Sequence, residues 1–138
     1  MSNKDELEIE ALVENLPKVL EFVDEKLDAK DCPAPVKIQI DIAVEEIFVN
    51  IASYAYNPEI GAATIEVEVK DDPLSVELTF IDNGVQYDPL AKENPDITLS
   101  AEERGIGGLG IFMVKESMDN VEYEYSNGKN ILKIKKTF

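Results

Sequence analysis

Residues 64–81 read Thr64-Ile-Glu-Val-Glu-Val-Lys-Asp-Asp-Pro-Leu-Ser-Val-Glu-Leu-Thr-Phe-Ile81, and this stretch decides the fold class. Apolar and polar side chains alternate from Thr64 to Lys70 and again from Leu74 to Ile81. That two-residue period is typical of strands with one buried face. Asp71-Asp-Pro73 between them has the composition of a turn. The stretch therefore predicts a β-hairpin packed on a core.

Outward from this hairpin, two further regions show the same alternation. Val121-Glu-Tyr-Glu-Tyr125 and Ile131-Leu-Lys-Ile-Lys135 flank Asn127-Gly128, a strong turn pair, and predict a second hairpin. Leu7-Glu-Ile-Glu-Ala-Leu12 also alternates and predicts a strand near the N-terminus.

Helical spacing of apolar residues separates these strands. It predicts helices over Leu16–Leu27, from Val36 to about Tyr56, and over Gly107–Met118. The order of elements predicts an α/β two-layer sandwich in one domain, residues 1–138, with a mixed, mostly antiparallel sheet and helices on one face. The other face is left either exposed to solvent or as a dimer surface.

Composition restricts the partners and chemistry of the chain. Its net charge is −16, which argues against free nucleic acid and suits a basic protein partner or simple solubility. There is no histidine, and the single Cys32 allows no intrachain disulfide. No apolar run is long enough to cross a membrane, and the start lacks the apolar core of a secretory signal, so we expect a cytoplasmic protein.

Three short segments carry residues suited to binding and catalysis. Glu46 and Asn50 lie four residues apart on the second predicted helix and hence on one face of it. An amide oxygen suits Mg²⁺, and a carboxylate one turn away could accept a proton from an attacking hydroxyl or water. Taken alone, the pair is equally compatible with a solvated helix face.

The second segment, Asp82-Asn-Gly84, follows the strand that ends in Phe80-Ile81. A carboxylate at this edge can accept a hydrogen bond from an adenine amino group, and a glycine allows a flat base to approach the backbone. An ordinary turn is the alternative.

The third segment contains Gly105, Gly107, Gly108 and Gly110, with Leu109 between the last two and Arg104 before them. Glycines before a helix expose backbone N–H groups that can hold an anion, and Arg104 could pair with a phosphate or with one of the many acidic side chains. A hinge and a closely packed helix is the alternative. The preceding residues 90–104 are polar without a period, which suggests a lid or binding loop.

Together these segments resemble the GHKL nucleotide-binding superfamily, whose N, G1 and G2 boxes match them in order. The likeness includes Asn50-Ile-Ala-Ser-Tyr-Ala-Tyr56, Asp82-Asn-Gly-Val-Gln-Tyr-Asp-Pro89, and Gly107-Gly-Leu-Gly-Ile111 leading to Met118-Asp119. Within the superfamily, the chain is similar to the small anti-sigma factor serine kinases of bacterial stress-response and sporulation switches.

The resemblance implies ATP and Mg²⁺ between helices and sheet. Asn50 is then the Mg²⁺ ligand, Glu46 the base that activates a substrate serine, and Asp82 and Gly84 the residues at adenine. Gly105, Gly107, Gly108 and Gly110 surround the phosphates, with residues 90–104 as the lid, and we count Arg104 and Leu109 among the ATP-binding residues. The implied partners are a STAS-domain antagonist, which is phosphorylated, and a sigma factor, which is sequestered by a homodimer.

Of two other functions, one stays open. The chain could be a nucleotide-gated binding module that holds a sigma factor or another regulator without catalysis. The catalytic half of a sensor histidine kinase is disfavoured, because the chain has no histidine to phosphorylate.

Overall fold

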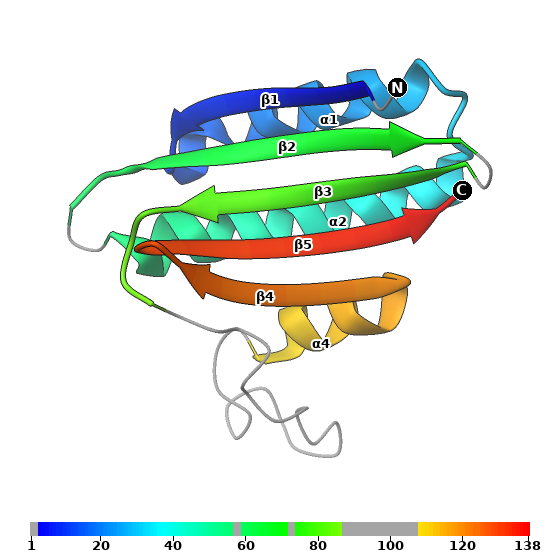
Figure 1. Ribbon diagram of the computed structural model, residues 1–138. Coiled ribbons are helices and arrows are strands. Elements are labelled where there is room, and N and C mark those ends of the chain that lie inside the picture. The colour runs from blue at the N-terminus through cyan, green and yellow to red at the C-terminus, as the bar shows by residue number, and fades with distance from the viewer. Residues whose placement is uncertain (1–2, 57–58, 72–73, 87–107) are drawn as a thin grey trace.

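The fold, seen in a computed structural model that describes residues 3–56, 59–71, 74–86 and 108–138, is one sheet with helices packed on one face (Figure 1). The elements are β1 (Asn3–Glu10), α1 (Leu16–Asp28), α2 (Ala34–Asn50), β2 (Ala62–Lys70), β3 (Ser75–Asp82), α4 (Gly108–Ser117), β4 (Asn120–Ser126) and β5 (Lys129–Thr137). A 3-10 turn, Val13–Asn15, precedes α1, and a π-helical turn, Ile51–Ala55, follows α2.

The five strands lie in the order β1-β2-β3-β5-β4, and every pairing between them is antiparallel. The predicted α/β two-layer sandwich is confirmed, but "mixed" was wrong for the described strands, since the two hairpins join edge to edge without a parallel pair. The join is the β3–β5 pairing, which sets Asp82 opposite Asn130.

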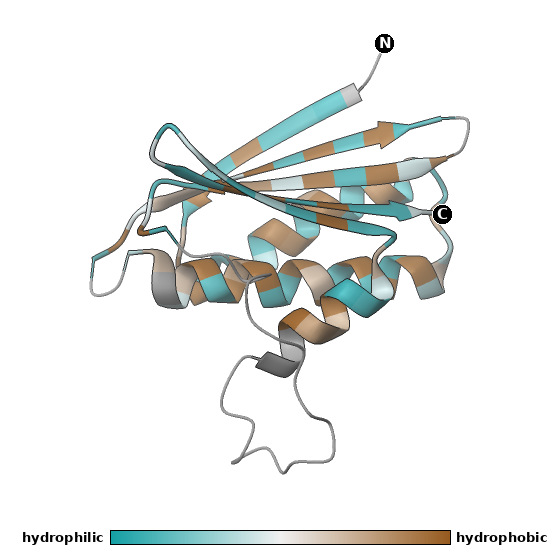
Figure 2. Ribbon diagram, turned by 60° about the horizontal axis from the view of Figure 1, so that its bottom comes forward, coloured by the Kyte–Doolittle hydropathy of each residue, from teal (hydrophilic) through white to brown (hydrophobic). Residues whose placement is uncertain are grey.

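The core lies between the helices and the sheet. The inward side chains of the central strands, such as Val67, Leu78 and Ile134, are at most 1% exposed. Burying one such side chain stabilises the fold by about 1.5–3 kcal/mol. Figure 2 shows the matching alternation of hydrophobic and hydrophilic residues along strands and helices. No helix in the described part of the chain combines the length and apolarity needed to span a bilayer.

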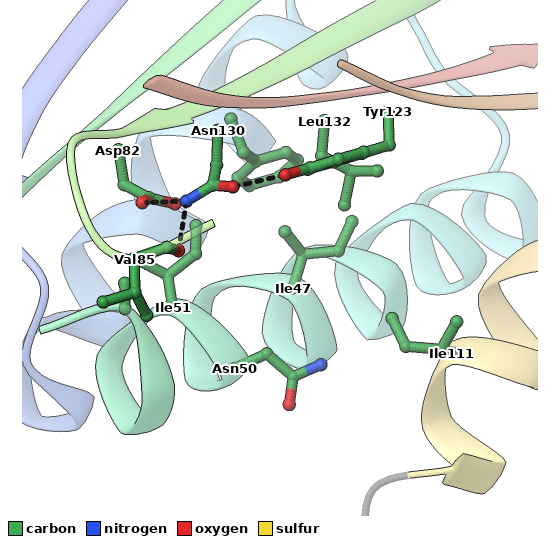
Figure 3. A pocket seen from close by; sticks show the side chains of 11 residues that line it. Ile47, Asn50, Ile51, Asp82, Val85, Ile111, Tyr123, Asn130 and Leu132 are labelled. Carbon is green, nitrogen blue, oxygen red and sulfur yellow. Dashed lines mark hydrogen bonds between the residues drawn. The ribbon is translucent and has the colours of Figure 1, made fainter. Parts of the chain in front are cut away.

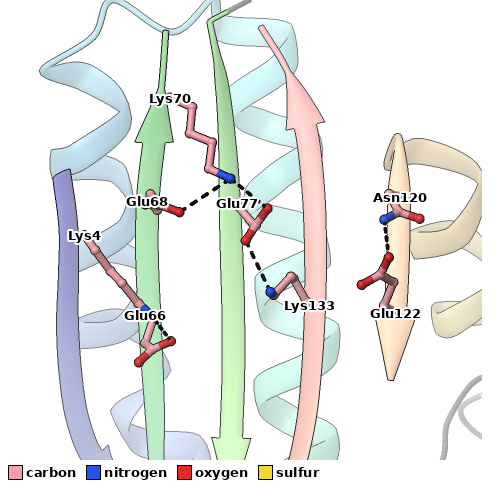
Figure 4. A network of polar contacts seen from close by, with 8 residues as sticks. All are labelled: Lys4, Glu66, Glu68, Lys70, Glu77, Asn120, Glu122 and Lys133. Carbon is pink, nitrogen blue, oxygen red and sulfur yellow. Dashed lines mark hydrogen bonds and ion pairs between the residues drawn. The ribbon is translucent and has the colours of Figure 1, made fainter. Parts of the chain in front are cut away.

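The face of the sheet opposite the helices is polar (Figure 4). Lys4 pairs with Glu66 at 3.1 Å, and Glu77 lies between Lys70 and Lys133 at 3.5 and 3.4 Å. Such exposed pairs contribute only about 0.2–1 kcal/mol each. The polar residues of the alternating strand pattern therefore lie on this face, and the apolar residues lie on the face towards the core.

Two predicted bounds were wrong. The first strand is Asn3–Glu10 rather than Leu7–Leu12, because its polar start pairs with β2 along a sheet edge while Ala11 turns away and donates its N–H to the Gly61 carbonyl at 2.8 Å. The second helix begins at Ala34, and its α-helical part ends at Asn50 instead of continuing to Tyr56. The π-helical turn beyond it keeps Ile51 and Ala55 buried, so the apolar spacing does not reveal the change.

The other predicted helices and strands are present, with ends within about two residues of those expected from the same periodicities.

Candidate functional site

A pocket opens between α2 and the sheet, beside α4 (Figure 3). Most of its lining is apolar, and the polar groups lie at two ends. Asp82 and Asn130 lie together against the sheet, while the Asn50 side chain points away from them at the α2 side. The full lining is Ile47, Asn50, Ile51, Ala55, Phe80, Asp82, Val85, Ile111, Tyr123, Asn130 and Leu132.

Asp82 ends β3 and is only 5% exposed. Its Oδ1 accepts a hydrogen bond from the Gly84 N–H at 2.9 Å and another from Asn130 Nδ2, also at 2.9 Å. Both bonds reach the same oxygen, so Oδ2 takes part in neither. Two donors fix the carboxylate at one end of the pocket, in a low-dielectric position where an ionised group requires such partners.

Asn130 is a site residue that sequence reasoning missed. Its Nδ2 also donates to the Val85 carbonyl at 2.8 Å, and its Oδ1 accepts from the Tyr123 hydroxyl. An asparagine in a strand carries no motif, but the register could have identified it. With the turn at Asn127-Gly128 fixing β5, antiparallel pairing with β3 places this amide opposite Asp82.

Gly84 has a structural reason to be glycine. A Cβ at this position would lie 2.2 Å from the carbonyl oxygen of Ala55, in the π-helical turn. The same Ala55 oxygen accepts the Val85 N–H at 2.9 Å. The segment after β3 is therefore packed directly on the backbone that follows α2, and contact with a base stays a prediction.

Asn50 and Glu46 lie on one face of α2, as predicted. Asn50 Nδ2 donates to Glu46 Oε1 at 3.3 Å, which leaves Asn50 Oδ1 as the atom for a metal ion. Both side chains are half-buried, but only Asn50 lines the pocket. The described residues contain no group of three or more Cys, Asp or Glu side chains that could hold a metal ion.

The glycine segment is only partly described. Gly108, Leu109 and Gly110 form the first turn of α4, which packs against α2, and Ile111 directly after them lines the pocket. The first turn of α4 therefore lies beside the pocket, on the side to which Asn50 points (Figure 3). Arg104, Gly105, Gly107 and the predicted lid 90–104 lie outside the described residues.

Comparison with known proteins agrees with this geometry. The sequence profile of the histidine kinase-like ATPase domain matches residues 9–136. The chain belongs to this family. The predicted resemblance to GHKL ATPases is thereby confirmed, as is the fold that it implies.

Named relatives of this histidine kinase-like ATPase domain are kinases. It is 32% identical over 101 residues to the serine-protein kinase RsbW of Listeria monocytogenes serovar 1/2a, covering 70% of this chain and 63% of that protein. It is 32% identical over 98 residues to the protein of the same name from Bacillus cereus strain B4264, covering 68% and 60%. The match thus spans less than two thirds of these relatives.

Proposed function

We propose that this chain binds Mg-ATP in the pocket between α2 and the sheet and transfers the γ-phosphoryl group to a serine of a STAS-domain antagonist. In its other state it sequesters a sigma factor. The single observation that carries the proposal is the separation of polar groups in one apolar pocket, with Asp82 at one end and Asn50 at the other (Figure 3). The relatives named as serine-protein kinases support the choice of acceptor.

The Asp82 end suits adenine. Apolar side chains such as Phe80, Leu132 and Ile51 line the pocket beside the carboxylate and can contact a flat base. Asp82, held by Gly84 and Asn130, presents an acceptor for the 6-amino group of adenine, at the position where guanine and hypoxanthine carry a carbonyl oxygen. This end of the pocket therefore favours adenine over other purines.

The Asn50 end suits the metal and the phosphates. Mg²⁺ usually retains several waters and takes few protein ligands, which matches one amide oxygen better than a carboxylate cluster. When bound, Mg²⁺ would neutralise charge on the triphosphate. The first turn of α4, with Gly108, Leu109 and Gly110, would contribute backbone N–H groups to phosphate oxygens. We assign Arg104, Gly105 and Gly107 to the same phosphates, and residues 90–104 to the lid.

Glu46 would act as the base. Its carboxylate accepts the proton of the substrate serine hydroxyl as the serine oxygen forms a bond to the γ-phosphorus, and the bond from that phosphorus to the β–γ bridging oxygen breaks to release ADP. The Glu46 carboxylate accepts a hydrogen bond from Asn50 Nδ2 at 3.3 Å, so it lies next to the proposed metal ligand, Asn50.

A second function is favoured by one observation. Glu46 is bonded to Asn50 and does not line the pocket. A chain whose carboxylate serves only to orient the metal ligand would be a nucleotide-gated binding module. It would capture a basic partner through its net charge of −16 without phosphorylating anything. Either function is compatible with a homodimer.

The test uses purified chain, a STAS-domain protein and Mg-ATP, with nucleotide titration and phosphoserine detection. Asn50→Ala should abolish the Mg²⁺-dependent part of ATP affinity. Glu46→Gln keeps the bond to Asn50, so it should retain ATP affinity and lose phosphoserine formation. Glu45→Gln, the same change one position away on an exposed side chain, is the matched control and should behave like wild type.

The outcomes separate the proposals. Wild type that does not bind ATP in a Mg²⁺-dependent manner would refute the nucleotide site. Normal phosphorylation by Glu46→Gln would refute the role of this carboxylate as base. If the wild type binds ATP and captures its partner but produces no phosphoserine, the kinase function is refuted and the nucleotide-gated binding module is supported.

A further inference from the structure

Tyr56 joins three segments that are far apart in the sequence. It follows the π-helical turn Ile51–Ala55 at the end of α2. Its hydroxyl donates to the carbonyl of Ala62, where β2 begins, at 2.7 Å, and accepts the N–H of Asn83, just after β3, also at 2.7 Å. One side-chain oxygen therefore fixes the Asn83 backbone, 27 residues away, to the sheet and to the helix end.

The Tyr56 ring is also in close contact with the rest of the fold. A Cβ at Gly61 would lie 2.3 Å from the ring carbons, so the ring packs directly on the glycine backbone. Burial raises the pKa of the Tyr56 hydroxyl, while the hydrogen bond from Asn83 acts in the opposite direction. The hydroxyl thus keeps its proton at neutral pH and can serve as donor and acceptor together.

The segment after Asp82 is consequently held from two consecutive residues. Ala55 accepts the Val85 N–H at 2.9 Å through its carbonyl, and Tyr56 accepts the Asn83 N–H. Both acceptors belong to the stretch of chain that follows α2. Asn130 holds Asp82 from β5. Of these contacts, only the phenol oxygen can be removed without changing the backbone or a side chain that lines the pocket.

We propose that Tyr56 is a positioning residue for base recognition, whose hydroxyl sets the segment after β3 so that Asp82 meets the amino group of adenine. This proposal rests on the proposed nucleotide site. Tyr56 does not line the pocket and acts through Asn83 and Asp82. Loss of the hydroxyl lets the segment shift, which weakens the contact to the base and leaves the Asn50 end unchanged.

The test is Tyr56→Phe, which keeps the ring on Gly61 and removes only the hydroxyl. Tyr125→Phe is the matched control, because that phenol is 40% exposed on β4. The measurements are hydrogen exchange of the Asn83 amide without nucleotide, and dissociation constants for Mg-ATP and Mg-ITP. We expect faster exchange at Asn83 and ATP affinity reduced by about fivefold, the factor for one typical hydrogen bond.

The decisive readout is selectivity. Affinity for ITP, which lacks the amino group, should change little, so the ATP-to-ITP preference should fall by nearly the same factor as ATP affinity. Equal losses for both nucleotides, as a general loss of stability produces, would overturn the proposal. So would an unchanged ATP dissociation constant or an unchanged Asn83 exchange rate. Wild type that binds neither nucleotide would instead refute the proposed function.

Discussion

Asn130→Ala tests how the site is held together. Asn130 is 6% exposed, and its amide donates to Asp82 at 2.9 Å and to the Val85 carbonyl at 2.8 Å while accepting from the Tyr123 hydroxyl. Truncation removes all three contacts from a site where water has little access. Asp82, Val85 and Tyr123 then each lose a partner.

The magnitude follows from these contacts. A hydrogen bond to a charged group contributes about 1.5–3 kcal/mol, and each buried polar group left unpaired costs about 1–3 kcal/mol. Because the three contacts share one side chain, their energies are not additive. We therefore expect Asn130→Ala to lower the free energy of unfolding by about 3 kcal/mol, in line with loss of a buried polar network.

Asn130→Asp sharpens the test because it keeps the shape and replaces the donor by a second carboxylate beside Asp82. Two adjacent carboxylates raise the pKa of the pair above its value in the unfolded chain. The folded state then binds more protons than the unfolded state, so stability is retained at low pH and lost as pH rises through the raised pKa. This variant should be less stable than Asn130→Ala at pH 7 and recover towards pH 4.5.

Urea unfolding followed by circular dichroism measures both effects, since the chain has no tryptophan. Asn120→Ala is the control, because among the described residues its side-chain amide bonds only Glu122, at 2.9 Å on the exposed sheet face (Figure 4). It should lie within about 0.5 kcal/mol of wild type. An Asn130→Ala protein as stable as this control, or an Asn130→Asp protein with no added pH dependence, would refute the reasoning.

Three further predictions follow from other contacts. Gly84→Ala places a Cβ 2.2 Å from the Ala55 carbonyl oxygen and should cost about 1–3 kcal/mol of overpacking in urea unfolding; stability equal to wild type would contradict the close approach. Burial, and then the adjacent carboxyl group of Asp24, raise the pKa of Asp41 to about 7, so the free energy of unfolding of the wild type should fall by up to about 1.4 kcal/mol per pH unit between pH 5.5 and 7. Asp41→Asn should remove this slope, which no histidine can mimic, and persistence of the slope would exclude the pair. Lys70→Met removes exposed ion pairs and should change the free energy of unfolding by under about 1 kcal/mol, less in high salt; a larger, salt-independent loss would contradict the surface assignment.

The Asp41 prediction has a geometric basis. Asp24 Oδ1 on α1 and Asp41 Oδ1 on α2 are both buried, and neither has a donor among the described residues. Lys37, the nearby cation, is bonded to Asp28 at 2.9 Å. A proton held by the pair is therefore stabilising below the unfolded-state pKa of an aspartate, near 4, and this contribution is lost as pH rises through 7.

The hairpins could be predicted because their information is local. Alternation over Thr64–Ile81 fixes which side chains face the core, and Asn127-Gly128 fixes the second turn, where the structure has positive φ at both residues. Glu46 and Asn50 were found for the same reason, since four-residue spacing on a helix determines their proximity.

Features that depend on distant segments could not be read in this way. The π-helical turn Ile51–Ala55 forms where the segment after β3 donates a hydrogen bond to the Ala55 carbonyl. The spacing of apolar residues along α2 does not predict that contact. Tyr56 and Asn130 act through backbone groups of distant residues, which have no sequence signature. Their roles emerge only once the strand register is known.

The join between β3 and β5 has a consequence for folding. Asp82 and the amide that holds it are separated by 48 residues, and the chain between them contains α4 and β4. Two strands joined by such a long loop pair late in folding, because closing the loop costs entropy before the contacts between the strands can offset it. A chain in which β5 has not yet paired with β3 therefore lacks the proposed adenine end of the pocket, and only molecules with β5 in place should bind nucleotide there.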